Sequence, residues 1–237
     1  MPTTLTKAID MFRGLFVRRN YKDSLFRRIF SDKKDLLDLY NALNGTNYDN
    51  PDELEIVTLE DAIYLSMKND LSFIISSTLN LYEHQSSINP NMPIRGFLYF
   101  ARQYEAYIAK NKLDIYGSSL VKLPAPRYIV LYNGTMAQPD ISELKLSNAF
   151  VNKEGITDDS DVLECRATVL NINYGHNTKT LNCCKRLHDY SFFVAKANER
   201  VYNGLESKEA IREAIAYCIE NDILTKTGKK TGQLANR

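Results

Sequence analysis

Apolar residues near the start of the chain recur at steps of three and four, which is the spacing of one face of a helix. This pattern predicts a helix over 23–43 with an interruption at Ser31 and Asp32, because both side chains compete for backbone hydrogen bonds. Asn44-Gly45 is a typical helix end. The apolar positions of this helix are Leu25, Phe26, Ile29, Phe30, Leu36, Leu37, Tyr40 and Leu43.

After residue 53 the apolar period shortens and short β-like runs alternate with longer helical ones. The expected elements are strands at 54–59, 71–75 and 79–82, a helix at 94–109, strands at 127–132 and 163–172, and helices at 181–195 and 207–224. This order is typical of an α/β protein with a mixed sheet. We expect one domain over 21–224, preceded by a lead-in at 1–20 and followed by a basic, mobile tail at 225–237.

Composition narrows the class of protein. The 237 residues are 44% hydrophobic and 25% charged, with a formal charge of +1, which is ordinary globular usage and excludes a histone-like basic coat. No apolar run reaches the roughly 20 residues of a membrane helix. The first twenty residues contain no stretch typical of a signal peptide. Since the four cysteines show no repeating spacing either, we expect a soluble, cytoplasmic protein without a membrane partner.

Two acidic residues flank a predicted hairpin. If Ser76 and Ser77 form a two-residue turn, Asp70 stands directly opposite Glu83, with Cβ atoms about 5 Å apart. Two carboxylates this close repel each other unless a cation lies between them, and oxygen ligands suit Mg²⁺. Gln85 shares a strand face with Glu83 and could orient an attacking water or contact a scissile phosphate.

The same spacing has an ordinary explanation. Asp70 and Glu83 could be solvated residues at strand ends, since charged side chains are usually exposed. A loop one residue longer would also place Glu83 on the opposite face from Asp70. One observation argues against solvated strand ends: Leu79 and Leu81 lie on the same strand face as Glu83, so Glu83 continues a row of apolar side chains.

The segments around these residues closely resemble the recombination-promoting nuclease/transposase family of the PD-(D/E)XK nuclease superfamily. The resemblance covers about residues 20–224. The segments are Lys68–Phe73 (KNDLSF), Leu79–Ser86 (LNLYEHQS), Asn89–Arg95 (NPNMPIR), Tyr21–Phe26 (YKDSLF), Leu39–Gly45 (LYNALNG), Tyr132–Gly134 (YNG) and Leu170–Asn177 (LNINYGHN).

The resemblance implies a restriction-endonuclease-like α-β-β-β-α-β core with a mixed sheet and C-terminal helices. It implies a metal-dependent DNA endonuclease linked to recombination or transposon-like activity, using Mg²⁺ with Mn²⁺ as a substitute. Asp70 and Glu83 stand at the metal-binding acidic positions, and the backbone carbonyl of His84 is a further ligand. Gln85 stands where the superfamily name has lysine. Asp23 could supply an outer carboxylate.

Basic side chains near the same segments are candidate DNA contacts. The segment from residue 13 to residue 34 contains eight basic residues and only two acidic ones. Phosphate binding is one interpretation and a solvated helix face is the other. The candidates are Lys22, Arg27, Arg28, Arg95, which lies at a helix start, and Gln103, which forms a Gln-X-X-X-Tyr pair with Tyr107.

Two competing functions remain open. The chain could be a DNA-binding module that has lost cleavage, or an interaction protein that forms a homodimer through the helices at 181–224. His84 is expected to point away from Glu83, either as a packing residue or as a residue behind the metal ligands. Cys183, Cys184 and His188 lack the spacing of a zinc site. The polar run at 171–177 fits a turn network better than a binding site.

Overall fold

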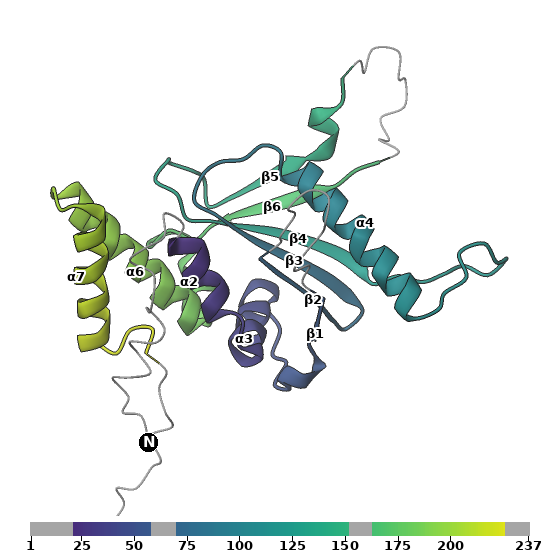
Figure 1. The fold of residues 1–237 in the computed structure, drawn as a ribbon, viewed down its shortest axis with the longest axis horizontal. Coiled ribbons are helices and arrows are strands. Elements are labelled where there is room, and N and C mark those ends of the chain that lie inside the picture. Colours follow the sequence, from purple (N-terminus) through teal and green to yellow (C-terminus); the bar gives the residue numbers. More distant parts are fainter. Residues whose placement is uncertain (1–20, 58–69, 152–162, 226–237) are drawn as a thin grey trace, which may run out of the picture.

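The computed structural model describes residues 21–57, 70–151 and 163–225 (Figure 1). Three predictions lie outside these residues: the lead-in at 1–20, the end of the strand at 54–59, and the tail beyond 225.

The predicted first helix is two helices, α2 (Tyr21–Ile29) and α3 (Lys33–Asn44). The break lies where the sequence predicts it, because the carboxylate of Asp32 caps α3 by accepting a hydrogen bond from the amide of Lys34 at 2.9 Å. Gly45 ends α3 in the left-handed region, with φ 65°, and its amide donates to the carbonyl of Asn41.

Six strands form one mixed sheet in the order β1-β2-β3-β4-β6-β5. The pairs β3–β4 and β4–β6 are parallel, and the other pairs are antiparallel. The mixed α/β class predicted from the sequence is therefore confirmed, whereas β5 was not predicted. The strands are β1 (Glu55–Ile56), β2 (Leu71–Ile75), β3 (Thr78–Gln85), β4 (Ala125–Tyr132), β5 (Ile141–Lys145) and β6 (Arg166–Asn171), with 3-10 turns at Pro51–Glu53 and Leu146–Ala149.

The remaining helices differ from the prediction mainly at one break. The helix predicted at 181–195 is a short α5 (Thr178–Cys183) followed by α6 (Lys185–Tyr202), separated by Cys184 in an extended conformation. The others are α4 (Met92–Lys110) and α7 (Ser207–Glu220). Across the described residues, no helix combines the length and apolarity that crossing a bilayer requires.

Helices cover both faces of the sheet (Figure 1). Along β3 the side chains alternate between two cores: Tyr82 packs with residues of α2, α3 and α6, whereas Leu79 and Leu81 pack with residues of α4. The end of β3 therefore lies between two helical layers.

The C-terminal helices contribute to the larger core. Ile211, Ala214, Ile215 and Cys218 on α7 are buried, together with Leu187, Tyr190 and Phe193 on α6. Many of the apolar side chains of these helices, which the competing dimer hypothesis invokes, are thus buried within the chain itself.

Candidate metal site at the end of the β2–β3 hairpin

The register of the hairpin is the one that the sequence predicts. Leu71 pairs with Tyr82 and Ile75 with Thr78, which leaves Ser76 and Ser77 as a two-residue turn. Both serines have positive φ, 46° and 58°, as a type I′ turn requires. Asp70 precedes Leu71 and Glu83 follows Tyr82, so that the two acids are opposite each other at the open end of the hairpin.

Asp70 completes the hydrogen bonding of the longer strand. Strand β2 begins at Leu71, whereas β3 continues to Gln85. The Oδ2 atom of Asp70 accepts a hydrogen bond from the amide of His84 at 2.7 Å, where a longer β2 would have supplied a backbone carbonyl. Burial raises the pKa of the Asp70 carboxyl, and the His84 amide opposes that shift.

Glu83 is almost fully buried, with 1% of its surface exposed. Its Oε2 accepts a hydrogen bond from Nη2 of Arg95 at 2.9 Å, whereas Oε1 is buried with no hydrogen-bond partner among the described residues. Leu79 and Leu81 are buried on the same face, as the sequence predicts. Burial, and then the charge of Asp70, raises the pKa of the Glu83 carboxyl to about 8, although Arg95 acts to lower it.

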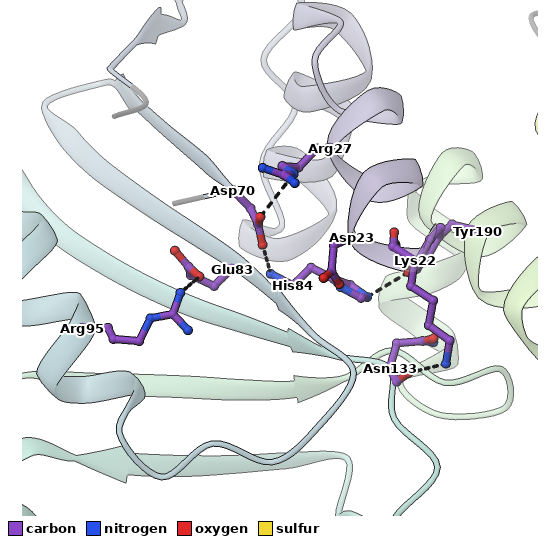
Figure 2. A network of polar contacts seen from close by, with 9 residues as sticks. All are labelled: Lys22, Asp23, Arg27, Asp70, Glu83, His84, Arg95, Asn133 and Tyr190. Carbon is purple, nitrogen blue, oxygen red and sulfur yellow. Dashed lines mark hydrogen bonds and ion pairs between the residues drawn. The ribbon is translucent and has the colours of Figure 1, made fainter. Parts of the chain in front are cut away.

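Each carboxylate has an arginine partner from a different helix (Figure 2). Arg27 on α2 lies 3.6 Å from Oδ1 of Asp70, and Arg95 near the start of α4 forms the ion pair with Glu83. The sequence analysis gives both arginines as candidate DNA contacts. In the structure, each arginine pairs with one of the two acids. Arg95 also contacts the hydroxyl of Tyr99 at 3.2 Å.

The donor set suits a hard divalent cation. Asp70 and Glu83 offer carboxylate oxygens, and Oε1 of Glu83 is a buried acceptor without a described donor. The carbonyl of Gln85 accepts from the amide of Asn133 on the β4 side, so the amide and carbonyl of His84 face the opposite edge, toward Asp70. These residues therefore fit Mg²⁺. Across the described part of the chain, this site included, no three histidine, cysteine or acidic side chains gather closely enough to hold a metal, so an ion here would depend on two carboxylates and a backbone carbonyl.

His84 points away from Glu83, as predicted, into the core beneath α2 and α6. Its Nδ1 lies 2.8 Å from Oδ1 of Asp23, and its Nε2 lies 2.8 Å from the hydroxyl of Tyr190. The structure places the carboxylate of Asp23, the expected outer carboxylate, against the ring of His84. No sequence signal identifies Tyr190, because it lies 106 residues from His84.

Gln85 occupies the last position of β3, on the same face as Glu83. Its half-buried side chain lines a cavity of about 40 Å³ together with Met92, Val130 and Tyr132. A polar group beside a cavity of this size can hold an ordered water.

Two predicted DNA contacts form hydrogen bonds within the protein. Gln103 is buried beneath α4, where its Nε2 donates to Oγ of Ser72. Lys22 donates to the carbonyl of Asn133 at 3.2 Å, and burial lowers the pKa of its amine. Gln103 is thus enclosed within the protein, whereas Lys22 is only half-buried and stays a predicted DNA contact. Arg28 is exposed on α2.

Cys184 is buried in the larger core, whereas Cys183 is exposed. The polar run at 171–177 is arranged as the sequence predicts. Asn171, Asn173 and Asn177 hydrogen-bond to one another and to nearby carbonyls, which makes the polar run a turn network.

Comparison with protein-family models, with curated proteins and with solved structures gives no match to this chain. The function is therefore inferred from the residues and their geometry.

Proposed function

We propose that the protein is a metal-dependent DNA endonuclease that hydrolyses phosphodiester bonds, of the recombination-promoting or transposase-associated type. One observation carries the proposal: Asp70 and Glu83 stand opposite each other at the end of the hairpin, and a buried oxygen of Glu83 has no described donor. Burying an unpaired acceptor is costly, and such costs are typical of functional sites.

The residues divide the expected chemistry among them. Asp70, Glu83 and the carbonyl of His84 would hold Mg²⁺, or Mn²⁺ in its place. A cation there supplies charge neutralisation at a phosphodiester and lowers the pKa of a bound water. Gln85, beside its small cavity, would orient the attacking water. Arg27, with 44% of its side chain exposed, can reach a phosphate from the solvent side.

The element order supports the same proposal. Helix α3, strands β1, β2 and β3, helix α4 and strand β4 follow one another as α-β-β-β-α-β. This is the order of the restriction-endonuclease-like core that the family resemblance implies. Within the β-β-β segment, Asp70 lies immediately before β2 and Glu83 lies on β3.

A DNA-binding module without cleavage is the second candidate. Arg27 and Arg95 already contact the two carboxyl groups, and Gln85 carries no charge to steady a nucleophile. Such a protein would bind DNA with an affinity that falls steeply with salt, and would not cut it.

A plasmid-nicking assay in Mg²⁺ or Mn²⁺ tests the proposal. Wild type should nick, whereas Asp70→Asn and Glu83→Gln should lose at least about a hundredfold in rate, the order typical when transition-state charge stabilisation is removed. Glu143→Gln, on the exposed edge strand β5, is the matched control and should nick like wild type. Equal nicking by all four proteins would overturn the proposal. DNA binding without nicking by wild type would favour the second candidate.

A further inference from the structure

The buried ring of His84 is held at both nitrogens. Asp23 on α2 contacts Nδ1 and Tyr190 on α6 contacts Nε2, each at 2.8 Å, and the ring stacks on Phe26 with centroids 5.1 Å apart (Figure 2). The side chains of His84 and Tyr190 are both fully buried. Two helices, α2 and α6, therefore fix the orientation of one imidazole on β3.

The contacts are satisfied in either state of the ring. With its proton on Nδ1, a neutral ring donates to Asp23 and accepts from the Tyr190 hydroxyl. With both nitrogens protonated, Nε2 donates instead, and the hydroxyl can turn to the carbonyl of Lys22 at 3.4 Å. The arrangement thus holds the ring in place without depending on its charge.

The backbone of the same residue contributes to the candidate metal site. The His84 amide donates to Asp70, and its carbonyl faces the same edge of the strand. Because ring and backbone share one Cα, a fixed ring limits rotation of the peptide groups around it. The hydroxyl of Tyr190 is the informative group, since a phenylalanine would fill the same space.

We infer that Tyr190 and Asp23 are positioning residues, which act through the His84 ring to hold the Asp70 carboxylate and the His84 carbonyl in place for a divalent cation. This inference rests on the proposed function for its metal. Residues one step behind a metal ligand typically change metal affinity by 10–100-fold.

Titration with Mn²⁺, followed by electron paramagnetic resonance, tests the inference without relying on cleavage. Tyr190→Phe should bind Mn²⁺ about tenfold more weakly than wild type. Tyr104→Phe is the matched control, because it also loses one hydroxyl hydrogen bond, to the carbonyl of Pro124 at 2.7 Å, toward the other end of α4. The control should bind Mn²⁺ like wild type.

Asp23 tests the same network from its other end. Asp23→Ala should weaken Mn²⁺ binding as Tyr190→Phe does, whereas Asp23→Asn, which retains an acceptor for Nδ1, should recover most of the affinity. The loss in the double variant of Asp23→Ala and Tyr190→Phe should be smaller than the product of the two single losses, since both act on one ring. Wild-type affinity in Tyr190→Phe and Asp23→Ala would overturn the inference.

Hydrogen exchange of the His84 amide separates this inference from the proposed function. Without metal, exchange at this amide should become about fivefold or more faster in Tyr190→Phe than in wild type, because its hydrogen bond to Asp70 loosens. If wild type does not bind Mn²⁺, the proposed metal site fails, while faster exchange would still support the positioning of Asp70. Unchanged exchange in the variant would overturn the positioning itself.

Discussion

Gly96 on α4 lies directly against the ring of Tyr128 on β4. A Cβ atom added at Gly96 would fall well inside van der Waals contact of the tyrosine Cδ1 and Cε1 atoms. The Tyr128 hydroxyl also donates to the carbonyl of Met92, at the first residue of α4. This close approach sets how near the start of α4, and with it Arg95, lies to the sheet.

Gly96→Ala should therefore destabilise the protein. We expect a loss of about 1–3 kcal/mol in the free energy of unfolding, the usual cost of overpacking, measured by urea denaturation. Gly117→Ala, where the nearest atom belongs to the flexible side chain of Asp114, should change that free energy by less than about 0.5 kcal/mol. Equal stability of Gly96→Ala and wild type would contradict the close packing.

The raised pKa of Glu83 predicts a pH-dependent stability in EDTA. The folded protein keeps a proton on Glu83 up to about pH 8, whereas the unfolded chain releases it near 4.5, so the free energy of unfolding should fall as pH rises between these values. Glu83→Gln removes this titration. We expect wild type to lose roughly 2–4 kcal/mol relative to the variant between pH 5 and 8, as measured by urea denaturation. A constant difference across that range would contradict the pKa shift.

The four cysteines should differ sharply in reactivity. Burial raises the pKa of the Cys184 and Cys218 thiols to about 12 and that of Cys165 to about 11, so these thiols stay protonated and shielded at pH 8. An aromatic disulfide reagent should label Cys183 rapidly and all four cysteines after unfolding. Cys183→Ser should abolish the rapid phase, and a surviving rapid phase would show that a buried thiol is accessible.

The Ser76–Ser77 turn offers a stabilising substitution. Ser77 has φ 58°, a conformation that is costly for any residue with a Cβ atom. Ser77→Gly should raise the free energy of unfolding by about 0.5–1 kcal/mol, after allowing for the greater chain entropy of glycine. Ser87→Gly, at a position without positive φ, should give no gain. Thermal denaturation of both variants checks this.

The partly exposed Arg27 and the buried Gln103 should behave differently toward DNA. Arg27→Gln should weaken binding and lower the slope of log affinity against log salt by about 1, as expected when one phosphate contact is lost. Gln103→Met should leave that slope unchanged, because the side chain is buried against Ser72. Fluorescence anisotropy with a short duplex at several salt concentrations measures both slopes.

Local patterns predicted the hairpin well. The register of β2 and β3 follows from alternation and from a two-residue turn, both of which are written within sixteen consecutive residues, 70–85. The cap at Asp32 and the stop at Gly45 are equally local. Strand β5 was missed because it is short, exposed on alternate residues and poor in β-branched side chains.

Contacts between distant elements were not predictable from the same patterns. The sequence suggests that Arg27 and Arg95 contact DNA. It does not show which carboxylate each arginine pairs with, because the two arginines lie on helices from opposite faces of the sheet. Likewise, Asp23 and Tyr190 meet His84 only because α2 and α6 pack together over one end of β3. Periodicity assigns a residue to a face, and tertiary packing then selects its neighbour.

The two arginines connect the acidic pair to helices on both faces of the sheet. Arg27 belongs to the layer of α2 and Arg95 to that of α4, so a ligand that neutralises the carboxylates releases a tether on each side of the sheet at once. The chain contains no tryptophan, and a single tryptophan introduced on the outer surface of either helix would be a clean optical reporter. The fluorescence of both tryptophan reporters should change at the same ligand concentration, because one binding step releases both ion pairs.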